Sequence, residues 1–547
     1  MSCPYANLNS PFPPIKKGPY PPLYEFITEK WKPHGGHLDE KVAIIDGTTG
    51  LQRTFRDQYE TIGALAATLH GEMGVGRDST VAIYSPNHVD FLSVTLAVSL
   101  CGGKLTPVNP AYTPGELEVI LERSKTSVLF AHVSTLNNAL VAAKHCSHVR
   151  HIVVIPDDPS EPLPEGTVAL QALCDPGRKI HKTADFVEDT NSYTCILPYS
   201  SGTTGLPKGV CLTHGNLVAN LLQFQQVEGP ALLPDHKLIS PLPFFHIYAF
   251  TVSMLYCAWT GNQVITNSGR FDFETFCKLV DEHKPQRAHL VPPILLGLSK
   301  SSVVGKYDVS SIDTIISAAA PLSSETETAV EQRLNCLVKQ AWGMSELSPI
   351  GTCNADSDSR TGSIGPLVSS TEAKVVDEEG NSLGPNEPGE LMIRGPQVMA
   401  GYLDDDEKTA ECLHNNWLKT GDLACYDEDG FFYITDRLKE LIKVRGFPVA
   451  PAELEALLLT HEAIRDAAVV PAPDEESIEL PRAYVVLKED ETSSNVSEES
   501  IYSWVKEQVA PYKRLDGGIV FVDEIPKSAS GKILRRILRD QLQAELR

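Results

Sequence analysis

The segment from Tyr199 to Gly209 has the composition of a phosphate-binding loop. Glycines let the backbone approach an anion, hydroxyl groups donate hydrogen bonds, and a lysine adds positive charge. It is not a Walker A loop, because Pro207 precedes the lysine and Gly209 to Leu212 has the pattern of a strand. The pattern predicts an anion-binding loop between two strands, with an ordinary Ser/Gly hairpin as the alternative. The candidate ligands are Ser200, Ser201, Gly202, Thr203, Thr204 and Lys208.

Other residues able to do chemistry occur in short motifs that also have purely structural explanations. Lys532 lies in a basic tail, where a surface lysine is common. Ser345-Glu346 suits the first turn of a helix, and Asp422 after a glycine suits a turn. His246 among aromatic residues is more often a buried core group. Taken singly, none of these motifs identifies an activity.

Taken together and in order, seven blocks resemble the adenylate-forming superfamily, and most closely the 4-coumarate:CoA ligases and their acyl-CoA synthetase relatives. The resemblance extends from about Tyr24 to Leu538. An ordered set of this length makes coincidence very improbable. The blocks are SSGTTGLPKGV, PLPFFHIYAF, SAAAPLS, QAWGMSE, WLKTGD, DRLKELIKVRGFPVAPAELE and PKSASGKILRR.

The resemblance implies a two-step reaction with ATP, Mg²⁺ and CoA. A carboxylate attacks the α-phosphate of ATP, pyrophosphate leaves, and the CoA thiol captures the acyl-adenylate. In the family pattern, Lys532 bridges the carboxylate and the α-phosphate, and its loss should cost on the order of 10²-fold in adenylation rate. Glu346 matches the carboxylate that holds Mg²⁺, and Ser345 matches a donor to the α-phosphate. His246 matches the histidine at the carboxylate end of the acyl pocket.

The same resemblance supplies nucleotide and acyl contacts. Asp422 would accept hydrogen bonds from the ribose hydroxyls, with Arg437 beside the same ribose. Trp342, where relatives usually have tyrosine, would lie along the adenine, although a buried core tryptophan is the structural alternative. The positions that line the acyl-adenylate pocket correspond to Tyr248, Ala319, Gln340 and Ala341.

A further set of positions would act in thioester formation. Lys439 matches the hinge about which the family rotates its small C-terminal domain between the two steps. Solvated charges at strand edges are the structural alternative for the basic members of this set. Pro448 departs from the pattern, because ligases usually carry glutamine there and proline supplies neither an amide side chain nor a backbone N–H. The residues expected to reach the nucleotide phosphate or CoA are Lys443, Arg445, Gly446 and Arg270.

The elements that must position these residues alternate between strand and helix patterns. Strands are predicted at Thr80–Tyr84, Val128–Ala131, His151–Ile155 and Cys195–Tyr199, with a buried helix from Phe91 that ends before Gly103. This alternation favours layered α/β structure with much parallel sheet. Ser324 and Glu327 have the spacing of a capping box.

From Glu372 the pattern changes to short strands separated by turns, which predicts a small antiparallel, barrel-like subdomain. After Asp436 we expect a strand at Leu438–Val444, a helix that begins at Pro451, and strands near Ala467 and Tyr484. The prediction is a large α/β N-terminal domain over residues 1–436, and a small, mobile α+β lid over residues 437–547 that carries the lysine.

Composition excludes several other classes of protein. The 547 residues exceed what one core usually organises, and 47 Lys+Arg against 71 Asp+Glu gives a net charge of -24 that disfavours nucleic acid and anionic lipid. The 12 cysteines are scattered without metal-ligand spacing, and no signal peptide or membrane span is evident. We expect a cytoplasmic protein. A peroxisomal location stays open, although Glu545-Leu546-Arg547 does not resemble Ser-Lys-Leu.

The expected function is a carboxylate:CoA ligase acting on an aromatic, 4-coumarate-like acid or on a medium- or long-chain apolar acid. A luciferase-like monooxygenase that oxidises an acyl-adenylate is the main alternative. Activation of an amino acid for a carrier protein would need an acid near Ile247 to pair the ammonium group, and none is present there. A nucleotide hydrolase of the P-loop class is disfavoured by the expected strand on each side of the loop.

Overall fold

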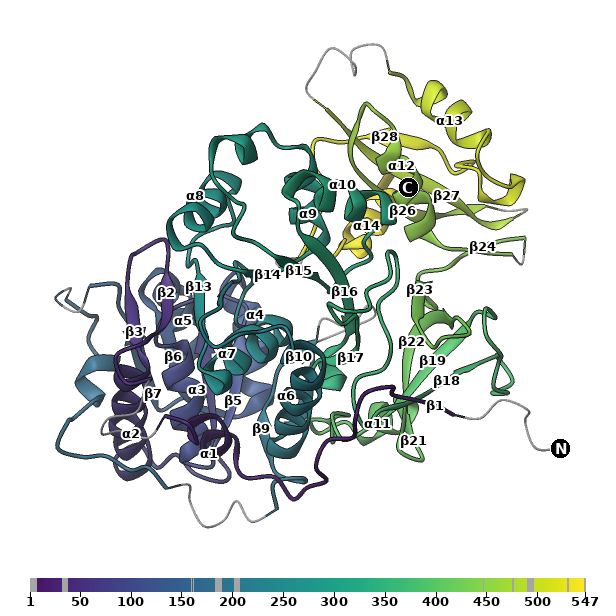
Figure 1. Cartoon of the computed structure of the whole chain (residues 1–547). Helices are drawn as coiled ribbons and strands as arrows, with labels where there is room; N and C mark the ends of the chain where they lie inside the picture. The colour runs from purple at the N-terminus through teal and green to yellow at the C-terminus, as the bar shows by residue number, and fades with distance from the viewer. Residues whose placement is uncertain are drawn as a thin grey trace.

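The computed structural model describes residues 7–31, 38–158, 160, 162–182, 189–200, 207–445, 447–474, 477–488, 496–528 and 531–545. Two parts are distinguished below. The body comprises the elements β1 to β23, and the lid comprises the elements β24 to β28 with α12 to α14. Figure 1 shows the lid, coloured from light green to yellow, beside the helices α9 and α10 of the body.

Two sheets of largely parallel strands form most of the body. In the first, the order is β17-β16-β15-β14-β12-β13-β2-β3, with antiparallel pairing only at its two ends. Its strands are β2 (Val42–Asp46), β3 (Gln52–Thr54), β12 (Lys237–Ile239), β13 (Gln263–Thr266), β14 (Arg287–Leu290), β15 (Thr314–Ser317), β16 (Leu337–Gly343) and β17 (Ile350–Cys353).

The second sheet has the order β10-β11-β9-β5-β4-β6-β7-β8, and β20 pairs with β11. Its strands are β4 (Thr80–Tyr84), β5 (Lys104–Val108), β6 (Thr126–His132), β7 (His151–Ile155), β8 (Thr167–Ala169), β9 (Thr194–Ile196), β10 (Tyr199–Ser200), β11 (Lys208–Thr213) and β20 (Gly401–Tyr402). The α/β prediction is confirmed. The run expected as one strand at Cys195–Tyr199 is instead split between β9 and β10, with Leu197 and Pro198 between them.

Helices cover these sheets, and several of them begin directly after a residue whose side chain caps the first turn. They are α1 (Leu23–Thr28), α2 (Phe55–Gly71), α3 (Phe91–Leu100), α4 (Pro114–Ser124), α5 (Leu136–Ala143), α6 (His214–Glu228), α7 (Tyr256–Thr260), α8 (Phe273–His283), α9 (Pro292–Lys300), α10 (Ser324–Leu334) and α11 (Asp406–Cys412). The helix α6 begins directly after β11, where Thr213 and Asn216 form a capping box. The phosphate-loop strand therefore runs into a helix with a fixed start.

The capping box predicted for Ser324 and Glu327 is wrong. Ser323 is the N-cap residue of α10, and its side chain accepts a hydrogen bond from the backbone N–H of Thr326. Glu327 is buried and is used elsewhere, since its Oε2 accepts hydrogen bonds from Gln340 Nε2 at 2.6 Å and from Gly362 N at 3.1 Å. The helix begins one residue earlier than predicted, so its N3 residue is Thr326 rather than Glu327.

A third sheet is antiparallel, as its turn-rich sequence predicts. Its order is β1-β18-β19-β22-β21, with β23 paired to β22, so the described strands form an open path rather than a closed barrel. The strands are β1 (Leu8–Asn9), β18 (Glu372–Val376), β19 (Gly389–Arg394), β21 (Leu413–His414), β22 (Trp417–Tyr426) and β23 (Phe432–Arg437). The register places Asp422 directly opposite Arg437.

The lid has its own sheet, of order β25-β24-β27-β26 with β28 paired to β27, and its own clusters of buried side chains. Its elements are β24 (Ile442–Val444), β25 (Phe447–Val449), α12 (Pro451–Thr460), β26 (Ile464–Asp474), β27 (Ile478–Leu487), α13 (Glu498–Lys506), β28 (Ile519–Phe521) and α14 (Arg535–Glu545). The strand expected at Leu438–Val444 is shorter than predicted, because residues 438–440 form a turn after β23. Pro448 lies on the edge strand β25, where a missing N–H costs no ladder bond.

A buried charge network joins two strands of the first sheet to the end of α6. Lys339 Nζ lies 2.8 Å from Glu228 and 2.6 Å from Asp356, and Arg287 contacts the same two carboxylates. Two cations thus face two anions, so the network is neutral although Lys339 is fully buried. It holds β16 in place at Lys339, directly before Gln340.

The described cysteines are free thiols, in line with the expected reduced state. Burial raises the pKa of several of them, for example that of Cys195 to about 12, so they are protonated at neutral pH. None of the helices described here has the length and apolar character that a membrane crossing requires.

Candidate active site

Lys532 is presented by a tight turn of the lid that packs on the body. Gly531, at φ 79°, donates its N–H to Ser528 O, and the Lys532 N–H donates to Ser528 Oγ. A Cβ atom on Gly531 would lie 3.0 Å from Cγ of Pro293, the second residue of α9. Glycine is therefore needed both for the positive φ and for the close approach. The turn places the lysine at the junction of lid and body, which we call the cleft.

The pKa of Lys532 is shifted by burial and by charged residues of the body. Desolvation by the surrounding protein, and then the positive charge of Arg437, lowers the pKa of Lys532 to about 8. Asp422, Glu440 and Glu346 oppose this shift. The side chain is still exposed to the solvent of the cleft. Lysine from the lid thus lies within electrostatic range of the body residues that the sequence blocks had singled out.

Asp422 is held by two donors. Trp342 Nε1 donates to Asp422 Oδ2 at 2.9 Å, and Arg437 Nε lies 3.2 Å from Asp422 Oδ1. Trp342 and Asp422 are buried, whereas Arg437 is half-buried. The three side chains come from β16, β22 and the end of β23. The arrangement fixes a carboxylate at the edge of the cleft with lone pairs on both oxygens still available.

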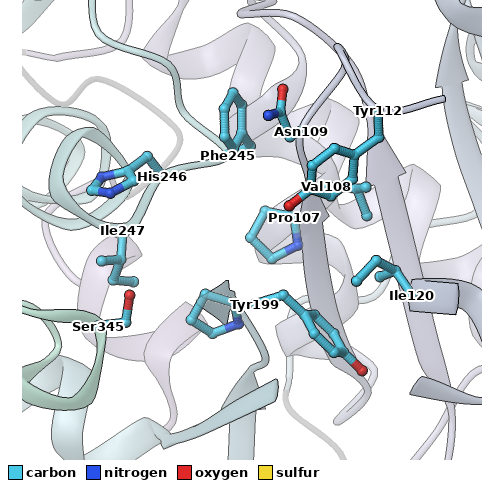
Figure 2. Close-up of a pocket in the computed structure, with 11 residues that line it drawn as sticks. Pro107, Val108, Asn109, Tyr112, Ile120, Tyr199, Phe245, His246, Ile247 and Ser345 are labelled. Carbon is cyan, nitrogen blue, oxygen red and sulfur yellow. The ribbon is translucent and has the colours of Figure 1, made fainter. Parts of the chain in front are cut away.

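His246 lies on the wall of a pocket that Figure 2 shows. Burial, and then the charge of Lys532, lowers the pKa of His246 to about 4, so the imidazole is neutral at neutral pH. Its Nδ1 accepts the backbone N–H of Tyr248 at 3.3 Å, which fixes the ring. The pocket encloses about 390 Å³ of empty space, part of it open to solvent, and is lined by Pro107, Val108, Asn109, Tyr112, Ile120, Pro198, Tyr199, Phe245, His246, Ile247 and Ser345.

Glu346 and Lys208 are linked by a residue that sequence reasoning missed. Tyr402 donates its hydroxyl to Glu346 Oε1 at 2.8 Å, and Lys208 Nζ lies 4.8 Å from the centre of the Tyr402 ring. The strand β20 places it there, because Tyr402 pairs with Val210 of β11. A Gly-Tyr pair in a loop gives little signal by itself, and only the strand pairing reveals its position.

Glu346 is the middle residue of a short 3-10 turn, Ser345–Leu347, which Met344 separates from the end of β16. Its carboxylate is buried, and its backbone oxygen accepts the N–H of Met399. Ser345 is the first residue of this turn and lines the same pocket as His246. The alternative explanation of Ser345 as a helix N-cap is wrong, because the N-cap is Met344, no side chain caps the turn, and Ser345 is its first residue.

Gln340 and Ala341 lie on β16 and are buried. Gln340 Nε2 donates to Glu327 Oε2, and burial raises the pKa of Glu327. This contact orients the amide, so that its oxygen is the end left for a ligand. Glu327 is a second supporting residue that the sequence pattern had assigned to helix capping instead.

Tyr248 is buried in the body, whereas Ala319 is half-buried. The Tyr248 hydroxyl donates to Ile316 O at 3.1 Å, and its ring stacks on His289. Ala319 has φ 75°, an unfavourable backbone region for a residue with a Cβ and one that occurs often at binding sites. Tyr248 also precedes a π-helix, Ala249–Leu255, a conformation that is frequent at functional sites. The sequence analysis did not predict this π-helix.

The remaining candidates are the residues assigned to thioester formation and those of the loop that begins at Ser200. Lys439, Lys443, Arg445 and Arg270 are exposed, and Lys443 and Arg445 belong to the face of the lid around β24. Arg445 Nε donates to Ser477 Oγ at 3.1 Å. Ser200 pairs with Lys208 across the expected strand pair. Ser201, Gly202, Thr203, Thr204 and Gly446 lie outside the described residues.

Comparisons with known proteins agree with this arrangement. A family model described as AMP-binding enzyme matches residues 34–403, and one described as AMP-binding enzyme C-terminal domain matches residues 453–532. The chain is 39% identical to 4-coumarate–CoA ligase 1 of Arabidopsis thaliana. The matched region covers 92% of this chain and 90% of the relative. It is 38% identical to 4-coumarate–CoA ligase of Pinus taeda, with 98% of each covered.

The fold is shared with a solved structure that contains an acyl-adenylate. The anthranilate CoA ligase AuaEII in complex with anthranoyl-AMP superposes with a TM-score of 0.86 at 25% identity, over 96% of this chain and 97% of the other. The likeness extends over lid and body together.

Proposed function

We propose that this chain, which belongs to the AMP-binding enzyme family, joins an aromatic carboxylic acid to CoA at the expense of ATP. The reaction is that of an AMP-forming acid-thiol ligase. The acid's carboxylate attacks the α-phosphorus of ATP and pyrophosphate departs, which leaves an acyl-adenylate. The CoA thiol, losing its proton, then attacks the acyl carbon, and AMP departs with the electron pair of the cleaved C–O bond.

The observation that carries this proposal is the convergence in the cleft. Lys532 of the lid lies within electrostatic range of Asp422, Glu346 and His246 of the body. Adenylate formation builds negative charge between an acid and a phosphate, so a preorganised cation there stabilises the transition state. A surface lysine of a basic tail would have no such neighbours.

The catalytic roles follow from the geometry of the first step. Lys532 attracts the substrate carboxylate and the α-phosphate to one place, which also pays much of the entropic cost of bringing them together. Ser345 donates a hydrogen bond to the α-phosphate. His246, neutral because of its low pKa, donates to the substrate carboxylate without adding charge.

Nucleotide binding is assigned to groups on the body. Asp422 and Arg437 hold the ribose, and Trp342, Gln340 and Ala341 line the adenine side. The phosphates lie at the loop between β10 and β11, with Ser200, Ser201, Gly202, Thr203, Thr204 and Lys208 as ligands. The paired strands fix the two ends of this loop.

Mg²⁺ fits the donor set, with Glu346 as its protein ligand. Tyr402 takes one lone pair of Oε1, so the other lone pairs of a hard carboxylate ligand remain. Among the described residues no group of three or more acidic, histidine or cysteine ligands could hold an ion. Phosphate oxygens would therefore supply most of the coordination, as is usual for magnesium. When bound, the ion neutralises charge on the departing pyrophosphate.

Two observations support an aromatic acid as substrate. The 4-coumarate–CoA ligases and the anthranilate CoA ligase are named for aromatic acids. The Tyr248 ring is buried, and its hydroxyl is already satisfied by Ile316 O, so it offers an apolar surface rather than a donor. With Ala319 it lines the acyl side of His246. A medium- or long-chain apolar acid is the competing substrate class.

Thioester formation is assigned to a second orientation of the lid. We propose domains at residues 1–436 and 437–547, with rotation about Lys439 in the turn that follows β23. Lys443, Arg445 and Gly446 then act toward CoA or the nucleotide phosphate, and Arg270 toward a CoA phosphate. Pro448 stands where ligases usually have glutamine and contributes no hydrogen bond to that state. The cytoplasmic location expected from the sequence stays a prediction.

A single incubation tests the proposal. The protein is mixed with ATP, Mg²⁺, CoA and cinnamic, benzoic or fatty acids, and AMP and thioester are measured together. Equimolar AMP and aryl-CoA support the ligase. Light or an oxidised acid that requires O₂ would instead support a luciferase-like monooxygenase. ADP and phosphate would contradict adenylate chemistry altogether.

A further inference from the structure

The hydrogen bond from Trp342 to Asp422 joins two separate sheets at the edge of the cleft. The indole N–H comes from β16 of the first parallel sheet, and the carboxylate comes from β22 of the antiparallel sheet. Asp422 is 4% exposed and Trp342 is 9% exposed, so water does not compete freely for this bond. Arg437 holds the other carboxylate oxygen.

Counting lone pairs shows what this arrangement leaves available. An ionised carboxylate has about four lone-pair sites, two on each oxygen. The indole takes one site on Oδ2, and the guanidinium takes one on Oδ1. One site remains on each oxygen, which is what two neighbouring hydroxyl groups require. Without the indole, the Asp422 carboxylate can rotate. The two lone-pair sites left for a ligand, one on each oxygen, then have no fixed direction.

The indole is itself immobilised. A Cβ atom on Gly351 would come within 2.6 Å of Trp342 Cζ3 and 3.0 Å of Cε3, so the ring lies directly on this glycine. The backbone of Trp342 pairs with Thr352 in the neighbouring strand β17. The ring cannot tilt toward β17, and the pairing of the two strands sets the position from which its N–H reaches Asp422.

From this geometry we propose that Trp342 is a positioning residue that orients Asp422 for the two ribose hydroxyls and so makes the enzyme selective for ribonucleotides over deoxyribonucleotides. The inference rests on the proposed function, because it assumes that Asp422 faces the ribose of ATP. It gives the tryptophan a role distinct from stacking on adenine, which phenylalanine would preserve.

The test compares ATP with 2′-deoxy-ATP and 3′-deoxy-ATP in the adenylation step, measured as acid-dependent pyrophosphate release. A hydrogen bond to a charged group predicts that the natural enzyme prefers ATP by about tenfold to a hundredfold in kcat/KM. Trp342→Phe should lower this preference to within about threefold of unity. The preference is a ratio within one protein, so loss of folded enzyme does not alter it.

Two further variants separate positioning from general damage. Gly351→Ala keeps both polar partners but displaces the indole, so it should lower the preference as Trp342→Phe does. Trp31→Phe is the matched control: Trp31 is also a buried tryptophan, but its Nε1 donates to a backbone oxygen, Ala258 O, at 2.8 Å rather than to Asp422. It should keep the natural preference.

Calorimetric binding of each nucleotide provides a second readout that needs no acid substrate. A Trp342→Phe protein that retains the natural preference in both assays overturns the inference, as does a natural enzyme that binds all three nucleotides equally. If no acid yields pyrophosphate but ATP still binds more tightly than its deoxy forms, the proposed reaction is wrong. The role of Trp342 is then decided by the binding preference alone, compared between the natural protein and Trp342→Phe.

Discussion

The rate of adenylation should fall as the pH rises through about 8, because Lys532 must carry its proton to attract the α-phosphate. The pKa of this lysine is lowered to about 8 by the surrounding protein and by Arg437. A group with this pKa is ~90% protonated at pH 7 and ~10% protonated at pH 9. We therefore expect kcat/KM for ATP to fall about tenfold between these two pH values.

The assay is acid-dependent pyrophosphate release without CoA, so that the thiol of CoA does not titrate in the measurement. The parameter kcat/KM reports the free enzyme, whereas kcat reports the complex with ATP. Bound phosphates raise the pKa of a neighbouring lysine, so the fall in kcat should occur at a higher pH than the fall in kcat/KM. His246, with a pKa of about 4, does not titrate in this range.

Two variants test whether Lys532 is the group whose titration lowers the adenylation rate. Lys532→Arg keeps a cation that stays charged at pH 9, so its lower rate should no longer fall across this range. Lys506→Ala, which removes an exposed lysine at the end of α13 in the lid, should keep the natural profile. If the Lys532→Arg protein shows the same fall with the same midpoint, another group titrates and the reasoning is refuted.

Three other variants probe the same structure. Lys532→Ala should lower adenylation by on the order of 10²-fold or more yet spare thioester formation from presupplied acyl-adenylate, whereas equal loss of both steps would contradict its role. Tyr402→Phe removes the donor to Glu346, so the Mg²⁺ concentration for half-maximal adenylation should rise about tenfold, and an unchanged requirement would exclude Tyr402 as a support of that carboxylate. Lys339→Met leaves Glu228 with less compensation, so the free energy of unfolding should drop by about 3–5 kcal/mol, a loss that urea titration would detect and that Glu228→Gln in the same chain should partly restore.

Much of the fold could be predicted because hydrophobic alternation and turn residues are local signals. The strands β4 and β7 have the predicted bounds, and Pro451 begins α12 as expected. The errors arose where tertiary packing overrides a local pattern. Glu327 has the spacing of a capping residue, yet it is buried against Gln340, and the turn at residues 438–440 interrupts an apparent strand.

The candidate site was predictable only as a set of motifs. The resemblance supplied Lys532, Asp422 and Glu346, but spacing along the chain does not reveal that a turn in the lid brings the first within electrostatic range of the other two. Supporting residues were missed for the same reason. Tyr402 reaches Glu346 through the pairing of β20 with β11, and a strand of two residues leaves almost no trace in a sequence.

The lid presents one face to the cleft and leaves another uncovered, which bears on how one site performs two steps. The lysine turn packs on Pro293, whereas Phe447 and Ile478 on the β24 side are 56% and 64% exposed. We expect these two apolar side chains to be covered in another orientation of the lid. Ile478 also has φ 71°, a strained value for a β-branched residue that solvent contact does not repay. Since the first step needs Lys532 in the cleft and the second needs room for a thiol, we expect rotation about the turn after β23 to bury this second face and withdraw the lysine.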